Sequence, residues 1–474
     1  MTLGALLVYF QAMKSILQFR GVTAILVFPL LAALASACGG GDDEEKIPFG
    51  LESEVVTSAD HASDIAFAPD GRMFFAEQFT GTIKVVSADG QLQEAPFAQV
   101  TVANWLNLDW GLTGLALDPE FEANHYVYAF YTSLAETAAA PANSGDQVSA
   151  VPPAVDAGEA VPQETPAGPA PLPPAGATFT PTPIPPTGET AAPQPQQAAP
   201  PGKPLLVRFT DVNGRGEDET VISDDFPVTS KDHPGYNGQG NIHFGPDGML
   251  YVSLGNYDDD PLVQDLSNPV GKLLRIDPET GEAPPDNPLT DNPDADPRIY
   301  AYGFREPFDF AFHPDTGDIY GSDNTTVSCE ELNIIKPGAN YGWPDVGEFP
   351  FGDCSAGDQV DAIHHFAREG KAPGDFLSLV EVSGLAFVPG SRYPALGDSL
   401  FACEAQTSAV EGVVTKGVLR RVLLAPPSFD SVTSSDLIVK DCKGDVETAP
   451  DGTLYYSNAG EIRRLIPGAA APTG

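Results

Sequence analysis

Four cysteines in the C-terminal half of the chain have a spacing that suits disulfide chemistry. They are Cys329, Cys354, Cys403 and Cys442, and they allow three pairings. Sequence proximity favours Cys329–Cys354 and Cys403–Cys442, because short loops close at a lower entropic cost. No CxxC pair supports a zinc site. We therefore expect two disulfides in an exported chain, and four free thiols are the alternative.

A fifth cysteine, Cys38, directly follows an apolar N-terminal run. Residues 21–37 carry no charge, follow two basic residues and end on small ones, which is the pattern of a secretory signal. The junction resembles a bacterial lipoprotein cleavage site, at which Cys38 becomes the lipidated first residue. Ordinary signal-peptidase cleavage after Ala37 and a short membrane anchor are the alternatives. We expect a signal over residues 1–38, a flexible acidic linker over 39–49, and a cell-envelope lipoprotein on the periplasmic or extracellular face.

The charge balance excludes one large class of partners. The 474 residues include 66 acidic and 24 basic side chains, which gives a formal net charge of −42. An acidic excess of this size repels phosphates, so we expect no binding to nucleic acid. We expect contact with a membrane only through the lipid anchor.

The elements that must position any site follow from an internal repeat. An apolar strand, a turn that begins at a proline and usually continues with aspartate, and a second aromatic-rich strand occur six times. Pro fixes φ at the turn entry, Asp bonds nearby amides and Gly accepts positive φ. Such units must stack to bury their faces, which predicts an all-β, six-bladed β-propeller over residues 50–466. The repeats span residues 65–78, 115–131, 242–256, 310–324, 385–404 and 446–465.

A segment rich in proline and alanine follows the second repeat. Residues 135–204 contain 18 of the 47 prolines and one aromatic side chain, Phe179. A stretch of this composition cannot bury enough apolar surface to offset its ordering entropy. We expect a disordered insertion within the propeller, and a C-terminal tail over residues 467–474.

One block of motifs identifies the chain more closely than the repeat does. Residues 233–344 contain GKLLRID, PDNP, YGFREP and ELN followed by NYGWP, in this order. Together they resemble the soluble quinoprotein glucose dehydrogenases, also described as glucose/sorbosone or aldose sugar dehydrogenases, to which hedgehog-interacting proteins are related. The resemblance covers the propeller apart from the insertion.

The resemblance implies a chemistry. Similar enzymes oxidise the anomeric carbon of an aldose to a lactone, with pyrroloquinoline quinone as hydride acceptor, a His as base and Ca²⁺ as Lewis acid. A His suits the base because its pKa is near neutrality, and the three carboxylates of the quinone call for Arg or Lys. By resemblance, His233 and Arg305 are the catalytic candidates. Arg305, Asp109 and Lys443 are the candidates for cofactor binding.

The sequence departs from the family pattern around these positions. Asn237 stands where the base usually lies, which leaves His233, four residues earlier, as a base or as an exposed turn residue. Glu306 follows Arg305 where similar enzymes have Asn. Asp109 replaces a frequent Gln, and only Lys443 remains near a position that usually carries Arg. The expected anion site is therefore poor in positive charge.

A second expected cofactor is a structural Ca²⁺. Glu331 and Tyr341 match positions that bind this ion in similar proteins, through the Glu carboxylate and the Tyr carbonyl. Ca²⁺ prefers such oxygen ligands. The alternative is that Glu331 is a solvated loop acid.

Three functions are compatible with these residues. The first is oxidation of an aldose or related polyol with pyrroloquinoline quinone and Ca²⁺. The second is a catalytically degenerate propeller that binds a glycan or protein and keeps the structural Ca²⁺. A weaker third is a Ca²⁺-dependent lactonase, because the fold alone does not select a reaction.

Overall fold

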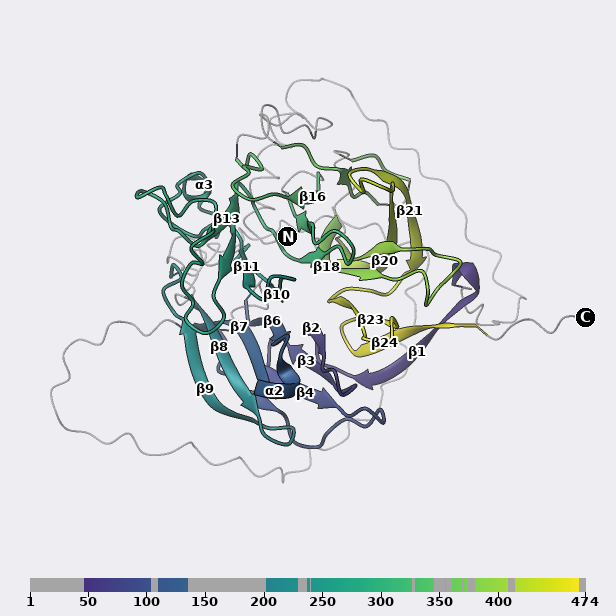
Figure 1. Cartoon of the computed structure of the whole chain (residues 1–474). Coiled ribbons are helices and arrows are strands. Elements are labelled where there is room, and N and C mark those ends of the chain that lie inside the picture. The colour runs from purple at the N-terminus through teal and green to yellow at the C-terminus, as the bar shows by residue number, and fades with distance from the viewer. Residues whose placement is uncertain are drawn as a thin grey trace, which may run out of the picture. The chain divides into compact units, whose positions relative to one another are not determined.

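The computed structural model describes residues 47–103, 110–134, 202–228, 237–238, 240–325, 329–344, 354, 360–368, 370–373, 380–407 and 414–468. Their strands form six four-stranded antiparallel sheets around a central axis (Figure 1). The predicted six-bladed propeller is therefore confirmed.

The first three blades follow one another along the chain, each starting with its innermost strand. Blade 1 contains β2 (Ala62–Phe67), β3 (Met73–Glu77), β4 (Thr82–Val86) and β5 (Ala98–Gln99). Blade 2 contains β6 (Leu112–Leu117), β7 (Tyr126–Leu134), β8 (Gly202–Asp211) and β9 (Gly216–Ser223), with helix α2 (Phe121–Asn124) in its first hairpin. Blade 3 contains β10 (Ile242–Phe244), β11 (Leu250–Leu254), β12 (Lys272–Ile276) and β13 (Ile299–Tyr302), with helix α3 (Asp260–Val263) between β11 and β12.

The last three blades complete the ring. Blade 4 contains β14 (Phe310–Phe312), β15 (Ile319–Asp323), β16 (Glu331–Ile335) and β17 (His364–His365). Blade 5 contains β18 (Val380–Val388), β19 (Ser399–Thr407), β20 (Val414–Leu424) and β21 (Val432–Val439). Blade 6 joins both ends of the described chain, because β22 (Val446–Thr448), β23 (Leu454–Ser457) and β24 (Glu461–Pro467) pair with β1 (Leu51–Ser58), which follows a 3₁₀ turn at Pro48–Gly50.

The repeated Pro-Asp-Gly turns have the geometry that their residue types predict. Asp70, Asp247 and Asp451 each accept a hydrogen bond from the backbone N–H two residues later, at 2.9–3.1 Å. The glycine that follows Asp70 has φ +88°, where a side chain would be strained. These turns fix the register of the two inner strands in their blades.

The innermost strands place equivalent residues in layers around the central channel. The first layer consists of the residues that stand five positions before each repeated proline. Where this residue is an aspartate, its carboxylate accepts a hydrogen bond from the backbone of the next blade. Asp64 accepts the N–H of Leu115 at 2.5 Å, and Asp445 accepts that of Ile65 at 2.9 Å. The six positions of this layer are Asp64, Gly114, Asn241, Asp309, Gly384 and Asp445.

The second layer consists of the residues that stand three positions before the same prolines. Their side chains are small in four blades and polar in two. His243 and Glu447 occupy blades 3 and 6, which lie opposite each other in a six-membered ring. The Nε2 atom of His243 lies 2.7 Å from the carboxylate of Asp309. The six positions are Ala66, Ala116, His243, Ala311, Ala386 and Glu447.

Both predicted disulfides are present. Cys329 pairs with Cys354 and Cys403 with Cys442, at sequence separations of 25 and 39 residues. The predicted insertion ends too late by three residues, because 202–204 belong to β8, where Gly202 pairs with Leu134. The rest of the insertion, residues 1–46 with Cys38, and residues 469–474 lie outside the described residues. Among the described residues, no helix is long and apolar enough to cross a membrane.

Candidate functional site

Arg305 lies between β13 and β14 and is held by bonds from its backbone and its side chain. Its N–H donates to both carboxylate oxygens of Asp323 at 3.1 Å. The guanidinium donates to the carbonyl of Asn324 at 2.7 Å and to Oδ1 of Asn237 at 3.0 Å, and it lies 3.4 Å from the Glu306 carboxylate. These contacts fix the guanidinium, and only 14% of the Arg305 side chain is exposed.

Asn237, at the position of the family's base, is bonded at both ends of its amide. Its oxygen accepts from Arg305, and its nitrogen donates to Oδ1 of Asn256 at 3.0 Å and to Oδ1 of Asp258 at 2.8 Å. The residue is buried and has φ +53°, a conformation that Asn tolerates better than most residues. An amide is not basic, so Asn237 bridges neighbouring groups and does not take protons.

The loop after β11 extends this network to an aromatic side chain. Asp260 accepts from the amide of Asn256 at 2.7 Å and from the indole Nε1 of Trp343 at 2.6 Å. The Trp343 ring lies 5.9 Å from the guanidinium carbon of Arg305. We call Arg305, Asn237, Asn256, Asp258, Asp260 and Trp343 the Arg305 cluster.

In the sequence this loop is rich in oxygen-bearing side chains, but their spacing identifies no metal site. Its acidic residues are typical of a solvated turn, and Asp258 is indeed exposed, whereas Asn256 is buried. These positions could have been predicted from a polar residue at or just after the end of the second strand of a blade. Asp323 has the same pattern, because it is the last residue of β15 and its carboxylate accepts the backbone N–H of Arg305.

Glu331 lies beside a second buried carboxylate. Asp323 and Glu331 are directly opposite each other on β15 and β16, so their side chains share one face of blade 4. Burial raises the pKa of Glu331 to about 8, and the neighbouring Asp323 adds to this increase. Burial also raises the pKa of Asp323 to about 7, against the opposing effect of the two N–H groups that it accepts. Two adjacent buried carboxylates make this face favourable for a cation.

A buried oxygen atom without a hydrogen-bond partner lies next to the Glu331 carboxylate. In the described part of the chain, this atom is Oδ1 of Asn333, and Oε2 of Glu330, the residue before Glu331, also lacks a partner. The amide nitrogen of Asn333 donates to Glu331 at 3.0 Å, so its free oxygen is close to the Glu331 carboxylate. Oxygen atoms that lack donors are the ligand type that Ca²⁺ takes.

Tyr341, the second residue that the resemblance assigns to Ca²⁺, is held by its backbone, its ring and its hydroxyl. Its N–H donates to the carbonyl of Tyr302 at 2.9 Å, and its ring stacks on Phe304 with 4.6 Å between centroids. The hydroxyl donates to the carbonyl of Ile334 at 2.7 Å, which leaves the backbone carbonyl as the atom expected to meet Ca²⁺. Among the described residues, no three His, Cys, Asp or Glu side chains form a metal-binding group. Ca²⁺ at Glu331 would therefore need backbone carbonyls and water as further ligands, and the partnerless Oδ1 of Asn333 beside Glu331 fits the oxygen chemistry of this ion.

Lys443 is the one other predicted site residue of the reaction centre that the structure describes, and its described contacts are made away from the Arg305 cluster. Lys443 lies between β21 and β22, donates its N–H to the carbonyl of Ser457 at 3.0 Å, and packs close to Gly417. Within the described chain, no hydrogen bond or ion pair links Lys443 to Arg305. His233 and Asp109 lie outside the described residues.

The described side chains do not fit pyrroloquinoline quinone. Its three carboxylates need several cationic donors, whereas Arg305 is the only cation of the Arg305 cluster and makes three side-chain contacts within the chain. Glu306 lies 3.4 Å from it, and Asp258 and Asp260 add negative charge to the same cluster, which repels an anion. We therefore derive no reaction step through this cofactor.

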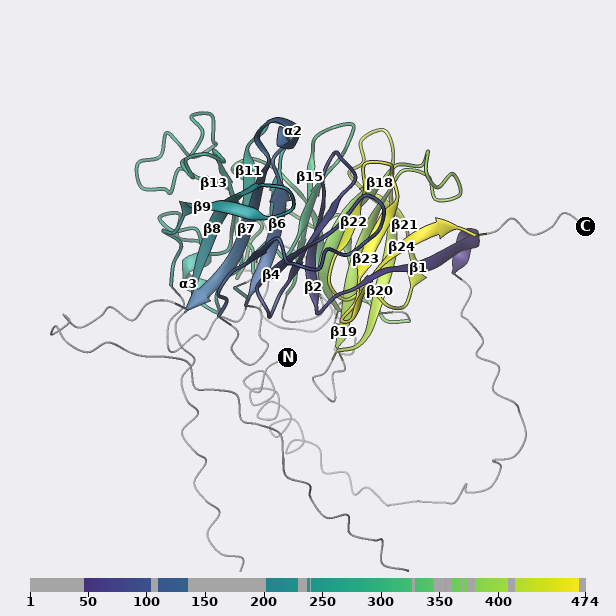
Figure 2. The same cartoon turned by 90° about the horizontal axis from the view of Figure 1, so that it is seen from below.

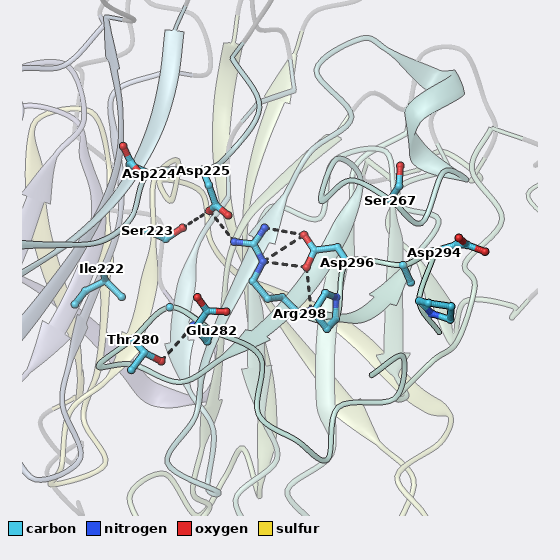
Figure 3. A pocket seen from close by; sticks show the side chains of 14 residues that line it. Ile222, Ser223, Asp224, Asp225, Ser267, Thr280, Glu282, Asp294, Asp296 and Arg298 are labelled. Atoms are coloured by element: carbon cyan, nitrogen blue, oxygen red, sulfur yellow. Dashed lines mark hydrogen bonds and ion pairs between the residues drawn. The ribbon is translucent and has the colours of Figure 1, made fainter. Parts of the chain in front are cut away.

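A cavity of about 520 Å³ lies away from these residues, beside the end of β9 (Figure 3). Arg298 lies in it, with guanidinium nitrogens 2.7 Å from the carboxylates of both Asp225 and Asp296 (Figure 3). No residue that the sequence analysis assigns to a site lines this cavity. Its lining holds five acidic side chains, and its one arginine is already paired with two of them, so we place the candidate site at the Arg305 cluster.

Comparisons with known proteins agree with the fold. A family model described as glucose/sorbosone dehydrogenase matches residues 59–154 and 202–466. Aldose sugar dehydrogenase YliI of Escherichia coli is 28% identical over 278 residues, which are 54% of this chain and 67% of that protein. Uncharacterized protein slr1608 of Synechocystis is 27% identical over 253 residues, 48% of this chain and only 56% of that relative. The crystal structure of a putative oxidoreductase (glucose dehydrogenase) from Thermus thermophilus is 26% identical with a TM-score of 0.61, and the match covers 88% of this chain and 100% of that one.

Proposed function

Because the chain belongs to the glucose/sorbosone dehydrogenase family, we propose that it binds a carbohydrate at the Arg305 cluster. The ligand class is an aldose, a related polyol or a glycan. We propose further that binding proceeds without the quinone chemistry implied by the family resemblance, and that Ca²⁺ at Glu331 and Tyr341 stabilises the propeller next to this site.

One observation carries the proposal. Where the family has its base, Asn237 is bonded to Arg305 through its oxygen and to Asp258 through its nitrogen. The two described residues that match the reaction centre therefore bind each other, and neither is free to move a proton. Arg305 and the exposed Asp258 still offer a donor and an acceptor, which is the combination that recognises hydroxyl groups.

A second candidate function is the oxidation of an aldose or polyol with pyrroloquinoline quinone and Ca²⁺. The retention of Arg305 within YGFREP and of Glu331 and Tyr341 favours it. His233 would be the base in this case, and further cationic groups would have to come from residues outside the described ranges. The two candidates differ in one measurable property, which is reduction of an artificial electron acceptor.

The test combines binding and turnover on the purified full-length protein. Calorimetry with a panel of aldoses, polyols and oligosaccharides, with Ca²⁺ or with a chelator, should give binding that Arg305→Ala removes. Arg464→Ala is the matched control, because Arg464 pairs with Glu54 on the exposed surface. Dye reduction that requires added quinone would overturn the binding proposal in favour of oxidation, and the absence of any carbohydrate binding or turnover would refute both.

We also propose that the protein is exported and carries a lipid on Cys38. Two disulfides support export, because disulfides persist in oxidising compartments. Labelling of cells with a palmitate analogue should mark the wild type and not Cys38→Ser. Equal labelling of both proteins would refute lipidation at this residue.

A further inference from the structure

The side chain of Lys272, at the start of β12, ends in a cage of backbone carbonyls. Its ammonium nitrogen lies 2.8 Å from the carbonyl of Leu262, 2.9 Å from those of Val263 and Asp265, and 2.7 Å from that of Val270. The residue has no exposed surface. A single cation is therefore coordinated by four oxygens of the loop between β11 and β12.

The ammonium of Lys272 is bound by carbonyl oxygens in place of the carboxylates that usually pair with a lysine. In the described part of the chain, all four hydrogen-bond partners of the ammonium are carbonyls and none is a carboxylate. Burial lowers the pKa of Lys272 to about 7, and the more distant charges of Asp265 and Asp296 oppose this effect. The four carbonyls favour the charged form, because an ammonium has three protons to donate and a neutral amine has two.

The caged loop is the one that supports the Arg305 cluster. It contains Asp260, which accepts the indole N–H of Trp343, and Gln264, which donates to the carbonyl of Trp343 at 2.6 Å. Gln264 and Asn340 also exchange hydrogen bonds through their amides, at 2.8 and 3.1 Å. Helix α3, inside this loop, has only four residues and cannot hold the loop by its own hydrogen bonds. In Figure 2 it lies at the lower end of the propeller, where β7 and β19 also end.

We propose that Lys272 is the built-in cation of the loop 256–271 and a positioning residue of the Arg305 cluster. It takes the place that a metal ion takes in other carbonyl-lined loops. By drawing four carbonyls together, it sets where α3 lies, and thereby where Asp260 and Gln264 hold Trp343. This role concerns the geometry of the site, so it holds whether the ligand is bound or oxidised.

Hydrogen exchange measured peptide by peptide on the full chain tests the proposal. Lys272→Met keeps most of the apolar stem and removes the charge, and it should speed amide exchange in residues 256–271 by about tenfold or more, while the strands of blades 1, 5 and 6 stay unchanged. Lys336→Met is the matched control, because Lys336 is half exposed and pairs with Asp318 at the surface. Wild-type exchange in 256–271 of the Lys272→Met variant would overturn the proposal.

Chemical rescue separates the role of the charge from that of packing. Lys272→Ala should expose a cage that ammonium or methylammonium ions can enter, so these ions should restore slow exchange in residues 256–271. Tetramethylammonium at the same concentration has no N–H group and should not restore it. If Lys272→Ala does not accumulate as folded protein, recovery of folded protein on refolding in the same salts is measured instead. Equal effects of ammonium and tetramethylammonium, in either measurement, would contradict a carbonyl-bound cation.

Discussion

Replacing Glu447 by Gln should flatten the dependence of stability on pH. Glu447 lies in the channel layer that is alanine in four other blades. Its removal from water raises the pKa of its carboxyl from the ordinary 4.5 to about 8, and the negative Asp309 contributes in the same direction, against a backbone N–H from Thr448. The folded protein therefore keeps a proton on Glu447 at pH values where the unfolded chain has lost it.

The sign and size of the effect follow from this difference. Stability from Glu447 is fully present below pH 4.5, declines as the pH rises, and is lost above about pH 8. The two pKa values differ by about 3.5, which at about 1.4 kcal/mol for each pH unit is at most about 5 kcal/mol. Gln cannot ionise, so the variant should lack this decline. Between pH 5 and 8.5 it should gain several kcal/mol relative to the wild type.

Urea unfolding followed by circular dichroism, with disulfides intact, measures this gain. The quantity to compare is the change in unfolding free energy between pH 5 and 8.5 in each protein. Glu122→Gln is the matched control, because Glu122 is exposed on α2 and should leave the wild-type decline unchanged. An identical decline in wild type and Glu447→Gln would refute the reasoning that the channel holds a protonated carboxyl.

Three further outcomes are expected. Ca²⁺ at a hundred times its dissociation constant should stabilise the wild type by about 2.7 kcal/mol and Glu331→Gln not at all, and equal thermal shifts in both would contradict a site at Glu331. Replacing Cys403 and Cys442 together by Ala should cost about 4 kcal/mol in urea unfolding, from the loop of 39 residues that they close, and a loss below about 1 kcal/mol would show that this entropy estimate fails. Gly255→Ala places a Cβ 1.7 Å from the carbonyl of Asn237 and should lower both thermal stability and carbohydrate binding, whereas Gly460→Ala, with its nearest atom 3.9 Å away, should change neither.

Local patterns were sufficient to predict the scaffold. A strand, a turn and a second strand carry their own signal in apolar alternation and in turn residues, and six copies must stack to bury their faces. The disulfide pairs also followed from sequence separation alone, because Cys329–Cys354 and Cys403–Cys442 close the shortest loops. The end of the insertion was less certain, because a proline such as Pro204 can also stand within a strand.

The departures at the candidate site were equally visible in the sequence. Asn237 stands at the position of the family's His base, and Glu306 stands at the position of the Asn in its Arg-Asn pair. Their consequence was not visible, since an amide next to an arginine in space has no sequence signature. The structure shows that Asn237 and Arg305 bind each other, and this contact changes the function that the site supports best.

The sequence by itself determined the blades, their number and the family, because these depend on residues close together in the chain. Only the tertiary structure decided which polar groups meet across blades. In the sequence, Lys272 is one basic residue of a predicted strand, whereas in the structure its ammonium contacts four carbonyls. Glu447 is likewise an ordinary strand residue in the sequence, whereas in the structure its carboxyl lies in the central channel. Such groups depend on how far apart their atoms lie and on how much water remains between them, and both are set when the ring closes.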